Sequence, residues 1–283
     1  MRGILKRFLA NRSFTVGSII LCFILLVITI APFIFIIDPN TIQYEKILLK
    51  PSGENIFGTD DFGRDLFSRV IVGGRVSLII GLQVMIGTTI FGTIIALLAG
   101  YFEKVDIIIM RFMDIMMAIP ALLLAISLLA VLRRNPIGVS LALIIAYTPR
   151  TVRIVRSCVL ALKEEVYVEA ARSIGVKTSL ILIRHILPGA IPILVVQGTF
   201  IFAYAILGEA AISFIGLGVQ PPSASWGNIL SDARVLMREA PWMVFAPGIS
   251  IMLAVFSLNI IGDGLREVLD PKRLKGGIRV VRE

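Results

Sequence analysis

Few side chains in this sequence could carry out catalysis or hold a metal ion. The chain has one histidine, His185, which excludes a site built from several histidines and does not favour a histidine general base. Asp114 and Asp263 could suggest an intramembrane aspartyl protease, but each has an arginine three residues away, and only one glycine precedes Asp263. We therefore predict no catalytic residue and no metal site.

The sequence also lacks the common nucleotide and hydrolase motifs. No G-x-x-x-x-G-K-[ST] phosphate loop is present, since the nearest segment, GVKT at 175–178, lacks the leading glycine and the Gly-Lys pair. Neither a G-x-S-x-G elbow nor an H-E-x-x-H helix occurs. We expect no cofactor to be bound by this chain and no enzymatic activity of its own.

Composition identifies an integral membrane protein. Of the 283 residues 57% are hydrophobic, and the mean hydropathy is +0.92. A membrane span needs roughly 20 mostly apolar residues. Six uncharged stretches approach or exceed this length: 13–37, 76–102, 115–132, 135–149, 186–208 and 240–262. The third and fourth need the polar residues at their edges, so we predict an all-α, polytopic membrane protein with six transmembrane helices.

The basic residues predict the orientation. If the N-terminus is cytoplasmic, 19 of the 28 Lys and Arg residues lie in cytoplasmic segments, as the positive-inside rule requires, and both termini are cytoplasmic. A net charge of +9 would also suit a nucleic-acid-binding protein. However, the charge lies beside the spans without interleaved aromatic residues or a zinc motif, so anionic membrane lipid is the expected partner and nucleic acid is not.

Charged residues near the spans are expected to serve structure. Aspartates and arginines alternate between Asp60 and Arg69 in the segment after the first span, where they favour ion pairs that fix a loop. The apolar residues at 66, 67, 70 and 71 predict a short interfacial helix. Arg111 and Asp114 are spaced to pair with each other, and Pro120 should kink the third span.

Two further positions suggest a function. Arg150, Arg153 and Arg156 share a face, and we place them at the cytoplasmic end of the fourth span, where they could reach lipid phosphates or a partner protein. Glu209 lies at the edge of the fifth span. It could line a translocation path, or it could make a hydrogen bond between helices.

One polar, patterned segment separates two apolar runs, from Lys163 to Pro192. Residues 164–174 lack Gly and Pro and predict a helix, with the apolar residues 166, 170, 171 and 174 on one side. Gly175 supplies the left-handed residue that ends it. Thr178 or Ser179 can cap a second helix that begins near Leu180.

The spacing within this segment resembles a known motif. Glu169, Ala170 and Ala171 are followed after three residues by Gly175, and then by Leu187 and Pro188. This pattern resembles the EAA loop of the membrane subunits of ABC importers. Phe57-Gly58-Thr59-Asp60 with Gly63-Arg64-Asp65 is similar to the N-terminal region of the C-type permease subunit in the dipeptide, oligopeptide and nickel importers of this class.

The resemblance implies a type I ABC importer permease fold and a set of partners. These are a second permease subunit that completes a heterodimer, two ATPase subunits that bind ATP and Mg²⁺, and an external solute-binding protein. The EAA-like loop, residues 163–188, would dock on the ATPase. In this loop the small side chains of Ala170 and Ala171 would allow close approach. Glu169 would make a polar contact, and Gly175 would form the turn.

The resemblance also implies a division of the chain and a substrate class. Residues 1–75 would form an N-terminal region with the first span, 76–270 the five-helix permease core, and 271–283 a cytoplasmic tail. Dipeptides or oligopeptides are the expected substrates, with nickel or a metal chelate as the alternative. An ATP-independent channel or carrier is the competing class, and it would not need the EAA-like loop.

Overall fold

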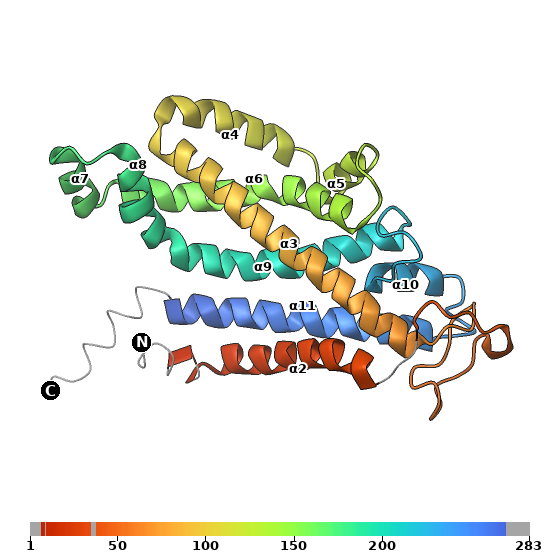
Figure 1. The fold of residues 1–283 in the computed structure, drawn as a ribbon. Coiled ribbons are helices and arrows are strands. Elements are labelled where there is room, and N and C mark those ends of the chain that lie inside the picture. Colours follow the sequence, from red (N-terminus) through yellow and green to blue (C-terminus); the bar gives the residue numbers. More distant parts are fainter. Residues whose placement is uncertain (1–6, 9, 35–37, 270–283) are drawn as a thin grey trace.

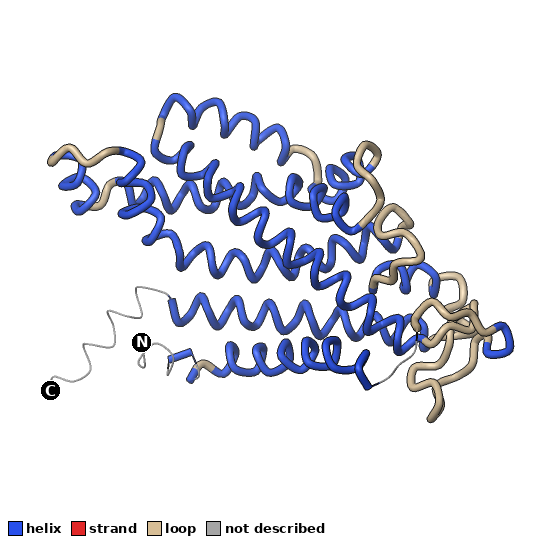
Figure 2. Tube along the Cα trace, in the orientation of Figure 1, coloured by secondary structure: helices blue, strands red, loops and turns tan. Residues whose placement is uncertain are grey.

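The computed structural model describes residues 7–8, 10–34 and 38–269, and this part of the chain is helical. Figure 2 shows long helices whose loops gather at their ends. Outside the helices, the described residues contain one isolated bridge, between Thr59 and Asp65, and no strand. The predicted all-α class is confirmed, whereas the tail 271–283 lies outside the described residues.

Within the described residues, five helices are long and apolar enough to cross a membrane. They are α2 (Arg12–Ile34), α3 (Leu66–Tyr101), α6 (Pro136–Lys163), the continuous helix Thr178–Phe214, of which α9 (Leu187–Phe214) is the main part, and α11 (Trp242–Leu269). A sixth span is formed if α4 (Glu103–Met117) and α5 (Ala121–Leu129) are counted together. The described part of the chain therefore shows five candidate spans, and six as predicted if this bent pair counts as one.

The break lies at Pro120. The axes of α4 and α5 differ by 86°, far more than the predicted kink. Pro120 has an extended ψ of 130° and stands immediately before α5, because proline cannot supply the N–H that would continue α4. The result is a short helix α5 set across the end of α4 (Figure 1).

The predicted interfacial helix before the second span is wrong. Leu66 instead begins α3, which runs for 36 residues without interruption, so residue 75 is not an element boundary. The helix continues through Gly73 and Gly74. Other elements approach the backbone closely at both glycines, and a larger side chain would not fit there. A Cβ at Gly74 would be 2.8 Å from the Trp226 ring. The side chain of Asp65 caps the start of α3 by accepting a bond from the N–H of Ser68.

Small residues let the helices pack closely. In Figure 1, α3 crosses α6 and α9, while α2 runs beside α11. Cβ atoms built on Gly87 and Gly92 of α3 would lie within 2.7 Å of Ile144 and Thr151 of α6. Since these glycines have no side chain, the two backbones approach more closely than larger residues would allow.

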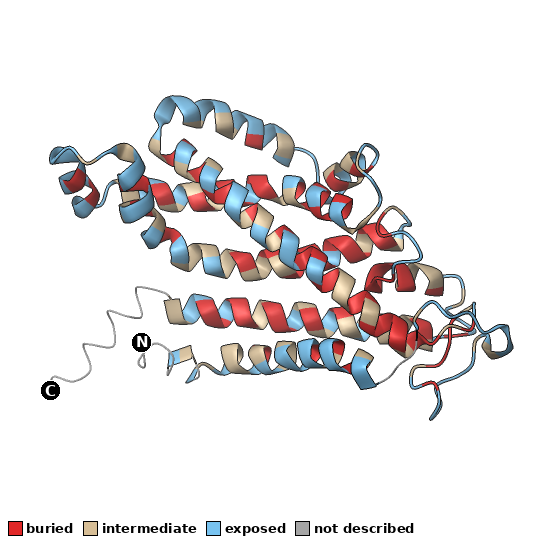
Figure 3. Cartoon of the chain, in the orientation of Figure 1, coloured by how far each residue is buried: buried red, intermediate tan, exposed pale blue. Residues whose placement is uncertain are grey.

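The helices present different elements at their two ends. The short helices α7 (Val166–Ser173) and α8 (Thr178–Ile181) project at one end, together with the start of α2 and the end of α11 (Figure 1). The segment 38–65, with the 3₁₀ turn η1 (Tyr44–Lys46), and α10 (Trp226–Ala233) cover the other. We name these the α7 end and the α10 end. Buried residues concentrate where α3, α6, α9 and α11 face one another, and α4 is exposed over most of its length (Figure 3).

Candidate functional site

The EAA-like loop is a helix closed by a glycine turn. Helix α7 ends at Ser173, and Gly175 adopts a φ of +78°, in the left-handed region predicted for it. The N–H of Val176 bonds to the Ala171 carbonyl at 3.1 Å, and that of Gly175 to the Arg172 carbonyl at 3.0 Å. These two bonds form a Schellman motif, which satisfies carbonyls at the helix C-terminus.

The two faces of α7 have different surroundings. Val168 and Ala171 are buried, whereas Val166 and Ile174 are 78% and 81% exposed. Glu169 and Ala170 are exposed as well. The prediction that Ala171 shares one side with 166, 170 and 174 is therefore wrong. Val168, which the pattern missed, forms the packed face with Ala171.

The buried face of α7 joins the loop to the long helices. Val168 and Ala171 belong to one apolar cluster with Val155 and Val159 of α6, Met113 of α4 and Ala96 of α3. Ile181, Leu182 and Ile186, which follow α7, complete this cluster. Among the long helices, α7 contacts α6 directly and reaches α3 through the shared cluster, so a displacement of α7 would be transmitted to α6 first, because close-packed side chains transmit movement.

A π-helical turn, η2 (Leu182–Ile186), links α8 to α9. Leu187 is partly buried and its N–H bonds to the Leu182 carbonyl, while Pro188 is exposed and lacks an N–H to continue the ordinary helical pattern. The expected cap at Thr178 or Ser179 is absent, because α8 begins at Thr178 itself.

His185 takes a packing role in this turn. The Tyr167 hydroxyl donates to the His185 carbonyl at 3.5 Å, and burial raises the pKa of Tyr167. The two rings lie beside each other, with centroids 6.5 Å apart.

The arginines of α6 are not at the end of a helix. Helix α6 continues to Lys163, well past the predicted span limit at 149. Arg153 pairs with Asp114, and Arg156 forms a two-bond pair with Asp106. The predicted pair of Arg111 with Asp114 is therefore replaced, because α4 packs against α6 and brings Arg153 closer.

Glu209 lies in a fully buried polar cluster at the α10 end of α9. Its carboxylate accepts hydrogen bonds from the hydroxyls of Ser77 in α3, at 2.8 Å, and Ser213 in α9, at 2.7 Å. The Ser77 hydroxyl in turn accepts the backbone N–H of Trp226, the first residue of α10, at 3.2 Å. Glu209 thus connects three helices of this chain.

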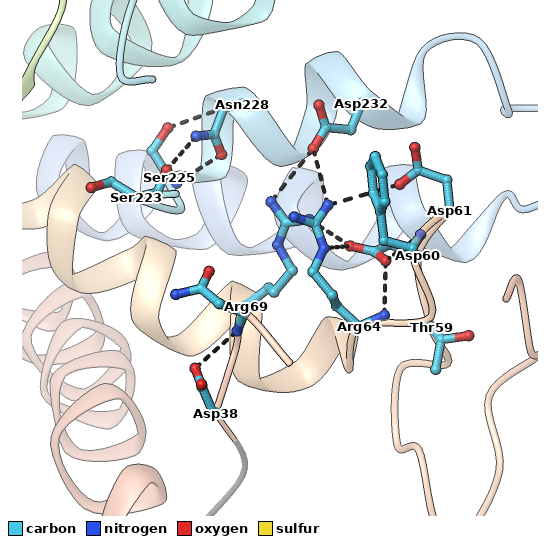
Figure 4. A network of polar contacts seen from close by, with 12 residues as sticks. Asp38, Thr59, Asp60, Asp61, Arg64, Arg69, Ser223, Ser225, Asn228 and Asp232 are labelled. Carbon is cyan, nitrogen blue, oxygen red and sulfur yellow. Dashed lines mark hydrogen bonds and ion pairs between the residues drawn. The ribbon is translucent and has the colours of Figure 1, made fainter. Parts of the chain in front are cut away.

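A buried charge network fixes the segment before α3, as predicted. Figure 4 shows Arg64 and Arg69 between the carboxylates of Asp60 and Asp232. Asp60 accepts the Arg64 Nε at 2.7 Å and also binds Arg69, while Asp232 of α10 lies 3.4 Å from the Arg69 Nη2. Burial raises the pKa of Asp232 although both arginines oppose the rise. Burial and repulsion from Asp60 and Asp232 raise the pKa of Asp61.

Sequence reasoning missed the residues of α10 that complete these clusters. Ser225 caps α10, and Asn228 returns a bond to the Ser225 backbone at 2.8 Å. The spacing Ser225-x-x-Asn228 before a helix is a readable signal for such a cap. The contact of Asp232 with Arg69 spans 163 residues and leaves no signal in the local sequence.

Two known protein families match this sequence. A family described as binding-protein-dependent transport system inner membrane component matches residues 88–275, which include the EAA-like loop and Glu209. A second family, the N-terminal TM domain of oligopeptide transport permease C, matches residues 1–51.

Similar proteins cover nearly the whole chain. The dipeptide transport system permease protein DppC of Alkalihalophilus pseudofirmus is 43% identical over 272 residues, covering 96% of this chain and 90% of its own length. The di/tripeptide transport system permease protein DppC of Pseudomonas aeruginosa is 39% identical, covering 94% and 90%. The glutathione transport system permease protein GsiD of Pectobacterium atrosepticum is 41% identical, covering 88% and 85%.

Proposed function

The chain belongs to the binding-protein-dependent transport system inner membrane components, and we propose that it is the C-type permease subunit of an ATP-driven importer of dipeptides or oligopeptides. The names of its relatives, which specify dipeptides, di/tripeptides and glutathione, favour a peptide over nickel as substrate.

The observation that carries this proposal is the two-faced helix α7. Its exposed face offers Val166, Ala170 and Ile174 beside the carboxylate of Glu169, and its buried face packs on the long helices. Exposed apolar side chains on a short projecting helix are a surface for a protein partner. A channel or carrier that works without an ATPase has no use for such a surface.

Each matching residue takes a role in coupling. Ala170 allows close contact with a groove of the ATPase, and Glu169 makes a polar contact there. Gly175 sets the direction of the chain after α7, and Leu187 with Pro188 begins the long helix α9 that must move. When ATP closes the ATPase pair, α7 pulls α6 and α9 through Val168 and Ala171.

The proposed orientation places the α7 end and both termini in the cytoplasm. The positive-inside distribution supports it, as do the positions of the start of α2 and the end of α11 beside α7. The two ATPase subunits, with ATP and Mg²⁺, bind at this end. The solute-binding protein docks at the α10 end, and a second permease subunit completes the path through the membrane.

Affinity purification of the tagged chain in mild detergent, followed by mass spectrometry, tests the partners. We expect a second permease and one or two ATPases with phosphate-loop motifs to copurify. Recovery of the chain alone or as a homo-oligomer that is active without ATP would refute the importer function.

Gly175→Val tests the docking loop, and the chain offers a matched control. Gly216 at the end of α9 has a φ of +80° and the same Schellman bonds, and at both glycines the position of an added Cβ has no other atom within 4 Å. Valine at either site costs about 1–2 kcal/mol of backbone strain. We expect both variants to insert, but only Gly175→Val to lose the ATPases on purification and to uncouple ATP hydrolysis from uptake. Normal uptake by Gly175→Val would contradict the assigned role of the loop.

A further inference from the structure

Arg150 is the first charged residue of α6, and it follows directly on the uncharged run of this span. It is the fifteenth of the 28 residues of α6, and its side chain is exposed on the surface of the chain. Charged residues within membrane-spanning helices are costly to expose to lipid, so they face a water-filled path, pair with an anion or reach toward the interface. Its position therefore calls for a functional partner.

The described residues provide no carboxylate for Arg150. The next two arginines along the same helix, Arg153 and Arg156, are paired with Asp114 and Asp106 of α4. Arg150 forms no salt bridge within the described part of the chain. Its guanidinium instead lies over the ring of Tyr204 in α9, 5.4 Å from the centroid. This cation–π contact holds the group in place but leaves its N–H donors available to another acceptor.

The surroundings of Arg150 form a mainly apolar groove beside α6 and α9, in which Arg150 and Gln197 are polar members. A cavity of about 250 Å³ is lined by Arg150, Gln197, Phe200 and Tyr204. A cavity of about 240 Å³ beside it shares three of these residues and extends to the break at Pro120. A third, of about 480 Å³, shares Gln197 and Phe200 and extends toward Arg266 at the α7 end. Together they make a groove that runs from the break at Pro120, past Arg150, to the α7 end.

The groove is held in shape by the helices that form it. Tyr147, one turn before Arg150, packs against Gly208, where a Cβ would lie 2.5 Å from its hydroxyl. That hydroxyl donates to the Tyr204 carbonyl at 3.2 Å. The cation, the aromatic ring and the amide of Gln197 therefore face one space from two fixed helices.

We propose that this groove is the half of the translocation path contributed by this chain, and that Arg150 receives the terminal carboxylate of the peptide in transit. The inference rests on the proposed function. A guanidinium binds a carboxylate through two parallel hydrogen bonds, and every peptide with a free C-terminus carries that group. The adjoining Gln197 can bond to peptide amides without selecting a side chain. Recognition of the terminus alone explains how one path can carry peptides of different sequence.

The competing occupant is an acidic side chain of the second permease. Either carboxylate would neutralise the Arg150 guanidinium, but removing the arginine charge has different effects in the two cases. If the peptide carboxylate is the anion, the defect depends on the substrate. If a partner carboxylate is the anion, assembly or transport of every substrate suffers equally.

Uptake by the complete complex in proteoliposomes separates these cases. The substrates are one dipeptide with a free carboxylate and the same dipeptide as its C-terminal amide, each supplied at concentrations shown to saturate the solute-binding protein. The variants are Arg150→Gln, Arg150→Lys and, as the matched control, Arg153→Gln, which removes a paired charge one turn along α6. Copurification of the partners is measured for each variant.

We expect Arg150→Gln to reduce uptake of the free dipeptide about 10-fold and that of the amide less than about twofold, because the amide cannot form the charged pair. Arg150→Lys should retain part of the preference for the free dipeptide over its amide. Arg153→Gln should keep the wild-type ratio of free-dipeptide uptake to amide uptake. An unchanged ratio in Arg150→Gln, or an equal loss for both substrates, would overturn the inference while leaving the proposed function intact. Uptake of neither substrate by the wild-type complex would refute the proposed function and the inference with it.

Discussion

Replacing Glu209 by alanine should destabilise the protein strongly, whereas replacing it by glutamine should not. Glu209 is fully buried and accepts hydrogen bonds from the hydroxyls of Ser77 and Ser213. Alanine removes both acceptors, and the serines cannot turn to water. Glutamine keeps the shape, and since each hydroxyl can donate or accept, both serines can still be satisfied.

The magnitude follows from the groups left unpaired. A buried hydroxyl without a partner costs about 1–3 kcal/mol, and Ser77 and Ser213, with Ser225 beside them, lose the carboxylate as a partner. Either serine can recover part of it by bonding to a carbonyl of its own helix. If Ser77 turns, however, it no longer accepts the N–H of Trp226 in the same position. We therefore expect a loss of about 3 kcal/mol for Glu209→Ala and less than about 1 kcal/mol for Glu209→Gln.

Equilibrium unfolding in mixed detergent micelles measures these differences. Trp226 lies fully buried beside the cluster, so tryptophan fluorescence reports the loss of this region. If Glu209→Ala were as stable as the wild type, the cluster would not hold α3, α9 and α10 together. If glutamine were as damaging as alanine, the negative charge itself, rather than the acceptor geometry, would be required.

Four further substitutions test other contacts. Asp60→Ala leaves the buried Arg69 without its closest partner and should cost about 3 kcal/mol, measured by the same unfolding assay. Asp61→Asn should stabilise by less than about 1 kcal/mol at pH 7, because burial raises the pKa of Asp61 and disfavours its ionised form. This gain should vanish below about pH 4, where the unfolded chain is protonated as well; a gain that is constant with pH would contradict the assignment. Gly227→Ala places a Cβ 2.7 Å from the α9 backbone and should lower stability by about 1–3 kcal/mol, whereas Gly248→Ala, with no atom within 4 Å, should raise it by up to about 1 kcal/mol.

Local patterns were sufficient for the features that depend on a few neighbouring residues. The number of spans follows from the lengths of the apolar runs, because backbone groups in lipid require a helix. The turn at Gly175 and the break at Pro120 follow from the backbone freedom of glycine and the missing N–H of proline. The ion pair of Asp60 with Arg64 was also predictable, since the two residues are four apart.

Local patterns did not predict which apolar side of α7 packs on this chain and which is left for a partner protein. Ala171 and Val166 are both apolar, but only Ala171 packs on the long helices. Helical spacing cannot distinguish a face that meets the same chain from one left for a partner, because both are apolar. In the same way, the pattern could not show that the segment after Asp65 begins a 36-residue helix, because the packing of Trp226 on Gly74 depends on a residue far along the chain.

By itself, the sequence determined the class of the protein, the apolar runs that can span a membrane and the loop that matches the importer family, because composition, periodicity and motif spacing are properties of neighbouring residues. Only the tertiary structure decided which charges are paired. Arg153 meets Asp114 across 39 residues and Glu209 meets Ser77 across 132, while Arg150 meets no carboxylate among the described residues. These outcomes depend on which helix faces pack together, and that choice minimises the exposure of polar groups over the whole assembly of helices.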